Sequence, residues 1–141
     1  GGLPLALGAS VACPDRKIIA LQADGSGMYT VQALWSMARE KADVTVIVLR
    51  NDNYAILEIE LARVREGDAN PRMLSMMNLT GPTLDWVRIS EGLGVPAVSA
   101  TTADEFHQHL DSALTNKGPR LIEARLTQNI QMMVDMIRRT K

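Results

Sequence analysis

The sequence contains little cysteine, little net charge and no long apolar run, and each scarcity excludes a class of protein. Its 141 residues include one cysteine, Cys13, so no internal disulfide is possible and a reducing, cytoplasmic location is expected. With 15 Lys and Arg against 16 Asp and Glu, the net charge of -1 does not support binding to nucleic acid or to a membrane surface. No apolar run approaches the ~18 to 20 residues that a membrane-spanning helix needs.

The chain begins "GGLPLALGA", with no initiator methionine and no basic and apolar signal sequence. This start reads like the interior of a protein, so we expect a fragment of a larger chain. A hydrophobic content of 46% is typical of one globular domain with a sizeable core. We assign residues 1–126 to that domain and expect residues 127–141 to form a helical tail.

Short apolar runs alternate along the chain with segments of helical periodicity. The first runs, "KIIALQA" and "DVTVIVLR", are nearly continuous in apolar residues, which is typical of strands covered on both faces. Strands are predicted over 17–23, 43–50, 95–100 and 119–126. Helices are predicted over 3–13, 28–41, 55–64, 83–94 and 101–116. This alternation predicts an α/β fold of three layers, a parallel sheet with helices on both faces.

Polar residues follow the first two predicted strands directly. "DGSGM" begins at Asp24 and "NDNYAI" begins at Asn51. In parallel sheets, ligands bind beyond the carboxyl ends of the strands, and neighbouring strands lie roughly 5 Å apart. The two loops are therefore predicted to face one pocket.

The residue types in these loops suit a divalent cation and a diphosphate. Asp24 and Asn51 offer the hard oxygen ligands that Mg2+ prefers. Gly25 lets the backbone approach a phosphate closely, Ser26 offers a hydroxyl, and a helix start near Ala55 presents free amides. Neither loop contains lysine, so this is no Walker-type loop, and the metal must neutralise the phosphates. The alternative is that both loops are merely good turn formers.

Asp-Gly-Ser, followed after 27 positions by Asn51, resembles the Gly-Asp-Gly…Asn-Asn signature of thiamine diphosphate-dependent enzymes. The stretch "LPLALGASVACPDRKIIALQADGSGMYTVQALWSMARE" is similar to the acetolactate synthase-like and benzoylformate decarboxylase-like branch. The similarity extends from residue 1 to about residue 126 and implies the thiamine diphosphate-binding fold, with thiamine diphosphate and Mg2+ as cofactors.

The resemblance implies a role for each matching residue. Mg2+ would be bound by the side chains of Asp24 and Asn51 and by the backbone carbonyl of Asn53. The diphosphate would be held by Gly25 and Ser26 and by backbone amides near Tyr54, Ala55 and Ile56. Two positions depart from the pattern, since Ala23 replaces the usual first Gly and Arg50 the usual first Asn. Neither position supplies a metal ligand in the family, so the site is expected to survive.

The resemblance also implies an activity on a small 2-keto acid, most closely that of an acetolactate synthase, which decarboxylates and ligates pyruvate in branched-chain amino acid biosynthesis. A 2-keto acid decarboxylase of the benzoylformate type is one alternative, and a non-enzymatic, flavodoxin-like nucleotide-binding module is another. In this family the activating glutamate comes from a separate domain of a partner subunit. No catalytic residue is therefore expected in this fragment, which should be inactive alone and should form a homo-oligomer, a dimer or tetramer.

Overall fold

The computed structural model describes residues 1–64 and 70–127, so the helical tail predicted for 127–141 lies almost wholly outside the described residues. The described chain forms two compact units, residues 1–50 with 85–126 and residues 51–84 with 127. The strands are β1 Ile18–Ala23, β2 Val44–Arg50, β3 Ala97–Ala100 and β4 Arg120–Arg125. The helices are α1 Gly2–Ala12, α2 Asp24–Gly27, the 3-10 helix η1 Met28–Thr30, α3 Ala33–Arg39, α4 Ala55–Val64, α5 Pro71–Ser75, α6 Trp86–Gly92 and α7 Ala103–Thr115.

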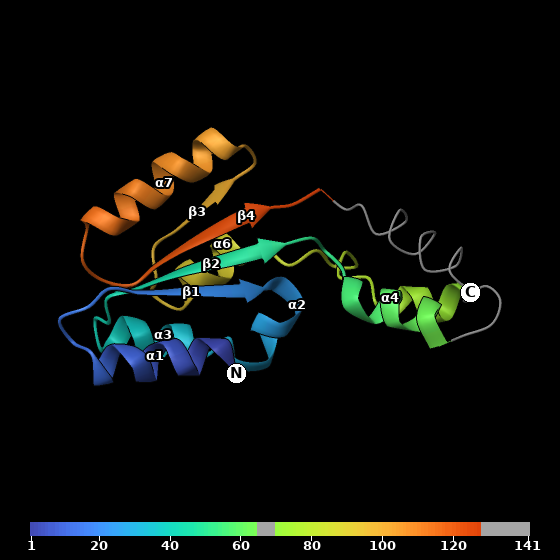
Figure 1. The fold of residues 1–141 in the computed structure, drawn as a ribbon, viewed down its shortest axis with the longest axis horizontal. Helices are drawn as coiled ribbons and strands as arrows, with labels where there is room; N and C mark the ends of the chain where they lie inside the picture. The colour runs from blue at the N-terminus through green and yellow to red at the C-terminus, as the bar shows by residue number, and fades with distance from the viewer. Residues whose placement is uncertain (65–69, 128–141) are drawn as a thin grey trace. The chain divides into compact units, whose positions relative to one another are not determined.

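The first unit is a parallel sheet with the strand order β1-β2-β4-β3 (Figure 1). Helix α7 lies on one face of the sheet, and α1 and α3 lie on the other. This arrangement confirms the predicted three-layer α/β fold. Because all strands are parallel, their carboxyl ends meet at one edge, and the loop that begins at Asp24 follows β1 at that edge.

Each helical layer buries an apolar stripe against the sheet. Under α7, Ala100, Ala113 and Ile122 form a buried cluster against which Phe106 and Leu110 pack. Helix α7 begins with a capping box, in which Thr102 and Glu105 satisfy each other's backbone amides. None of the helices in the described parts of the chain is both long and apolar enough to cross a membrane.

The prediction that β1 is covered on both faces is wrong. Ile19 is 50% exposed and Leu21 67% exposed. Strand β1 is the first strand in the order and pairs only with β2 among the described strands, and α7 contacts β3 and β4 instead. An apolar run predicts a strand, but it does not distinguish a central position from an edge position.

The helix predicted over 28–41 is shorter than expected. The chain passes through η1 and a turn before α3 begins at Ala33. The amides of Leu34 and Trp35 donate to the carbonyls of Val31 and Gln32 at 3.0 and 3.1 Å, which is the i to i+3 spacing of a tightened turn. A β-branched residue at 31 also lowers helix propensity there.

An ion pair connects three segments at the amino ends of the strands. Lys17 Nζ donates to Asp43 Oδ1 and to the carbonyl of Asn116, and the amide of Gly118 donates to the same Asp43 oxygen at 3.1 Å. Burial alone would raise the pKa of Asp43, but the hydrogen bonds and positive charge of Lys17 outweigh it, and the pKa lies below its ordinary value of 3.8.

Leu34→Ala should lower the free energy of unfolding by about 2–5 kcal/mol, because this fully buried side chain would leave a cavity. Val64→Ala, at a side chain that is 77% exposed, should change it by less than about 0.5 kcal/mol. Urea unfolding followed by circular dichroism measures both. Equal losses from the two variants would contradict the packing described above.

Asp43→Asn should destabilise the chain at pH 6 more than at pH 3. A lowered pKa in the folded state means that the ionised Asp43 stabilises the fold above the ordinary pKa, and that this contribution is lost as the pH falls through the folded-state value. Unfolding free energies of the wild type and the variant at both pH values provide the test. In a Lys17→Met background, the additional destabilisation by Asp43→Asn at pH 6 should be smaller. Equal destabilisation by Asp43→Asn at both pH values in the wild-type background would argue against the ion pair.

Candidate cofactor-binding site

Asp24 is held at the carboxyl end of β1 by a sharp change of backbone conformation. Ala23 is still extended, with φ -79° and ψ 149°, and Asp24 begins α2. The Asp24 side chain is only 2% exposed, and its Oδ1 accepts a hydrogen bond from the Gly25 amide at 2.8 Å. A buried carboxylate is unfavourable unless hydrogen bonds or a cation compensate it, so this position suits a metal ligand.

Gln22 and Ser26 shape the same loop. The side-chain amide of Gln22, a buried residue, donates to the Ser26 hydroxyl, which lies 3.3 Å from the carbonyl of Ala23. Gly27 allows close contact with α6, because a Cβ there would lie 2.6 Å from the Trp86 ring. The sequence pattern indicated Gly25 and Ser26 but gave no reason to single out Gln22 within an apolar strand.

A buried charge cluster lies at the same edge of the sheet. Arg50, at the end of β2, donates from Nη1 to Glu123 Oε1 at 2.8 Å, and the two side chains are 7% and 2% exposed. Arg125 Nε and Ser99 Oγ reach the same oxygen at 3.0 and 3.3 Å. Arg50 therefore has its charge compensated inside the protein. Sequence reasoning missed Glu123, although an acid within the apolar strand "RLIEARL" is a usable signal.

The second predicted loop belongs to the second unit. Asn51 Oδ1 accepts a hydrogen bond from the Asn53 amide at 3.1 Å, which closes a tight turn. Asp52 lies inside this turn with a positive φ of 57°, a conformation that Asn and Asp tolerate better than most residues. Its carbonyl accepts from the Leu79 amide at 2.9 Å.

The start of α4 is fixed by residues on both sides of it. The Tyr54 amide donates to the Met77 carbonyl at 2.8 Å, and the Tyr54 carbonyl accepts from the amides of Leu57 and Glu58 in the first turn of the helix. Asn53 Nδ2 donates to Glu58 Oε2 at 2.7 Å. Ala55 and Ile56 thus occupy the first turn of α4, where backbone amides have no partner within the helix.

The available donor atoms fit Mg2+. Asp24, Asn51 and Asn53 supply only oxygen ligands, which Mg2+ prefers. Asn53 Oδ1 is buried and has no hydrogen-bond partner in the structure, so this loop contains an oxygen able to accept a ligand or water. Within residues 1–64 and 70–127, no three His, Cys, Asp or Glu side chains gather at a metal site, and the proposed set needs only one acid.

The structure brings the predicted residues together in two groups. Asp24, Gly25 and Ser26 are consecutive in the first unit. The members of the second group, in the second unit, are Asn51, Asn53, Tyr54, Ala55 and Ile56. The convergence of both groups on one ion stays a prediction. What the described geometry defines is a parallel α/β domain with a buried carboxylate at the ligand-binding edge of its sheet.

Comparison with known proteins identifies the family to which this chain belongs. Residues 1–124 match the family described as "Thiamine pyrophosphate enzyme, C-terminal TPP binding domain". The chain belongs to this family, as the resemblance of its loop motifs implied. A flavodoxin-like nucleotide-binding module is disfavoured by this match.

Relatives within the family have different activities in their names. IlvX of Mycobacterium tuberculosis, provisionally named an acetolactate synthase large subunit, is 49% identical over 123 residues, which cover 86% of this chain and 24% of IlvX. Benzoylformate decarboxylase of Pseudomonas aeruginosa is 37% identical over 130 residues, covering 92% of this chain and 23% of that enzyme.

Solved structures confirm the fold. The thiamine diphosphate-dependent 4-hydroxybenzoylformate decarboxylase of Rhodococcus jostii RHA1 superposes with a TM-score of 0.81 at 36% identity, over 92% of this chain and 23% of that one. Benzoylformate decarboxylase of Polynucleobacter necessarius superposes with a TM-score of 0.71 at 29% identity, over 89% and 22%. This chain therefore spans about a quarter of the length of its relatives.

Gly27→Ala should lower the free energy of unfolding by about 1–3 kcal/mol, because the new methyl group would overlap the Trp86 ring. Gly8→Ala provides a matched control, since nothing lies within 4 Å of a Cβ at that position in α1. That variant should gain about 0.5–1 kcal/mol from helix propensity. Chemical unfolding measures both changes, and a neutral Gly27→Ala would show that the loop does not pack as described.

Proposed function

We propose that this chain supplies the diphosphate- and Mg2+-binding half of a thiamine diphosphate-dependent enzyme that acts on 2-keto acids. The observation that carries the proposal is the buried carboxylate of Asp24 at the carboxyl end of a parallel strand, in a chain that matches the cofactor-binding domain over residues 1–124. Ligands bind at this edge in parallel α/β sheets.

Each residue has a defined task in this proposal. The side chains of Asp24 and Asn51 and the carbonyl of Asn53 bind Mg2+, and Gly25 and Ser26 contact the diphosphate. Backbone amides at Tyr54, Ala55 and Ile56 complete the phosphate site at the start of α4, where the positive end of the helix dipole favours an anion. When bound, thiamine diphosphate supplies the electron sink for loss of carbon dioxide from a 2-keto acid.

The residues of this chain bind and orient the cofactor and do not transfer protons in the reaction. We assign no catalytic residue to residues 1–141, and we expect the chain alone to be inactive towards pyruvate. The 2-keto acid is the small-molecule partner of the complete enzyme, which we place in the cytoplasm.

We favour an acetolactate synthase-like activity, the decarboxylation and carboligation of pyruvate, because the similarity to IlvX is 49%. The alternative is a decarboxylase of the benzoylformate type, which the relatives at 37% and 36% identity support. The products distinguish the two: the full-length enzyme yields acetolactate from pyruvate in the first case and an aldehyde from an aromatic 2-keto acid in the second.

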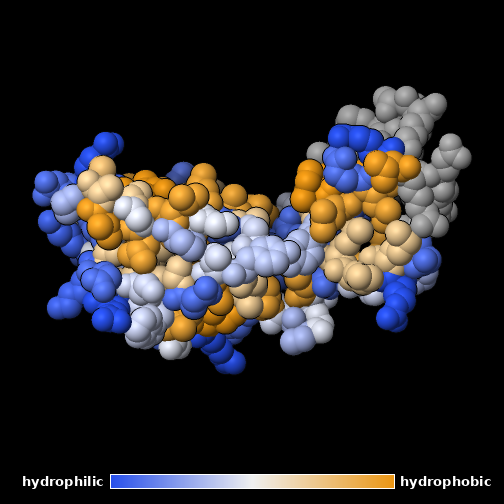
Figure 2. Space-filling model, turned by 90° about the horizontal axis from the view of Figure 1, so that it is seen from below, coloured by the Kyte–Doolittle hydropathy of each residue, from blue (hydrophilic) through white to orange (hydrophobic). Residues whose placement is uncertain are grey.

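The proposal includes association into a homo-oligomer. On α1, Leu5 and Val11 are 75% and 71% exposed, and Trp35 on α3 is 52% exposed. Figure 2 shows hydrophobic side chains on the face of the first unit that carries α1 and α3. Large apolar patches of this kind commonly mark sites of protein contact. We propose a dimer or a tetramer.

Asp24→Asn in the full-length enzyme should weaken Mg2+-dependent binding of thiamine diphosphate by at least about 100-fold, since the substitution removes the only charged metal ligand. Isothermal titration calorimetry with and without Mg2+ measures the effect, and circular dichroism checks that the fold is intact. Asp15→Asn, at an exposed turn residue, should leave binding unchanged. Retention of cofactor and turnover by Asp24→Asn would refute the assignment of the metal site.

A further inference from the structure

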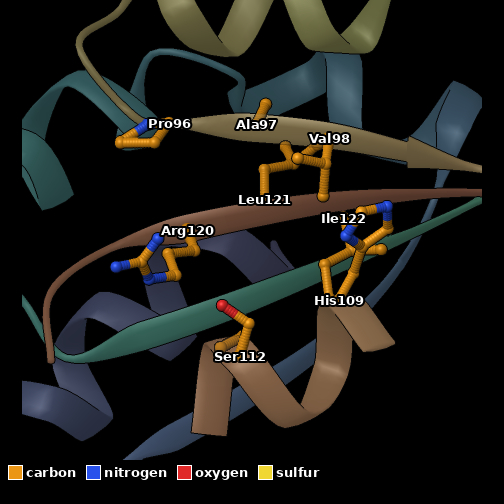
Figure 3. Close-up of a pocket in the computed structure, with 9 residues that line it drawn as sticks. Pro96, Ala97, Val98, His109, Ser112, Arg120, Leu121 and Ile122 are labelled. Atoms are coloured by element: carbon orange, nitrogen blue, oxygen red, sulfur yellow. The ribbon is translucent and has the colours of Figure 1, made fainter. Parts of the chain in front are cut away.

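A small cavity opens between α7 and the amino-terminal ends of β3 and β4 (Figure 3). Its volume is about 100 Å³. One water molecule needs ~10–15 Å³ of such space, so the cavity has room for several waters or one small ligand. It lies at the opposite edge of the sheet from Asp24, because Arg120 begins β4 whereas Asp24 follows the end of β1.

Arg120, on the wall of this cavity, differs from the other arginines on the strands. Arg50 and Arg125 both donate to Glu123. Among residues 1–64 and 70–127 no carboxylate pairs with Arg120, and its Nε is buried without a hydrogen-bond acceptor. A buried donor without an acceptor is unfavourable, which makes Arg120 a candidate anion ligand.

A second polar atom without a partner belongs to the adjacent strand. Thr45 on β2 pairs in register with Arg120 on β4, so both side chains project from the same face of the sheet. Thr45 is fully buried, and its hydroxyl also has no partner in the structure. Two unsatisfied polar groups therefore occupy neighbouring positions at this edge.

The cavity has a polar end and an apolar end. Figure 3 shows Ser112 Oγ directed from α7 towards Arg120, while His109 lies at the far end beside Val98 and Ile122. Ala113 on α7 also lines the cavity. Arg120 is the only permanently charged residue of the lining, so the site matches a ligand with one negative charge and a short apolar tail.

We propose that this cavity binds a small aliphatic carboxylate. The Arg120 guanidinium receives the carboxylate, which matches its planar arrangement of donors, and the Ser112 hydroxyl donates a further hydrogen bond. The apolar tail lies against Val98 and Ile122. The site is separate from the proposed cofactor site, and it does not depend on that proposal.

Titration of the 141-residue chain with isobutyrate, followed by amide NMR, tests the proposal. Isobutyrate should shift the signals of Val98, Ser112 and Ile122 to saturation, and isobutyramide, its neutral counterpart, should not. Arg120→Gln should weaken isobutyrate binding by about tenfold or more, because it removes a charge-assisted pair. Arg88→Gln, at a side chain that is 87% exposed, should leave binding unchanged.

Three results would overturn the proposal: equal binding of isobutyramide, undiminished affinity in Arg120→Gln, or tighter binding of inorganic phosphate than of isobutyrate. If Arg120→Gln does not fold, Ser112→Ala replaces it, since Ser112 is exposed on α7. That variant should bind isobutyrate about 3- to 10-fold more weakly through loss of one hydrogen bond to a charged group. Unchanged binding by Ser112→Ala in that case would also overturn the assignment.

Discussion

The parallel pairing of β1, β2 and β4 is the constraint on which the rest of the structure depends. It aligns the carboxyl ends of the strands, so that the loop beginning at Asp24 and the side chain of Arg50 lie at one edge of the sheet. An antiparallel sheet would send alternate strand ends to opposite edges. The ligand-binding edge therefore follows from the backbone hydrogen bonds, and the side chains determine what it binds.

Charge at this edge is balanced within the protein. Glu123 accepts hydrogen bonds from the buried Arg50 and the half-exposed Arg125, so its negative charge compensates both cations where the sheet ends. Asp24 is buried at the same edge, and hydrogen bonds such as that from the Gly25 amide help to hold its carboxylate there. Such preorganised groups would lower the cost of binding the proposed cation and diphosphate, because little has to reorder when they bind. At the other edge, Arg120 has no carboxylate partner among the described residues. The two edges of the sheet therefore suit different ligands.

Much of the fold could be predicted from local pattern. The strands ending at Ala23 and Arg50 and the helix α7 appear where apolar runs and helical periodicity indicated them. The exposure of β1 could not be predicted, since an apolar run has the same composition at an edge as in the centre. The contact of Arg50 with Glu123 joins residues 73 positions apart, a separation at which no periodicity applies.

The sequence by itself indicated the class of site: an acid after one apolar strand and an amide after the next resemble the signature of the family that residues 1–124 match. Local backbone preferences and residue chemistry depend on residues that are neighbours in the sequence, so they can be inferred without a structure. Tertiary structure alone decided that Glu123 neutralises Arg50 and that Arg120 faces a cavity, with no acidic partner among the described residues. Such contacts depend on strand order and register, which result from the packing of the whole sheet.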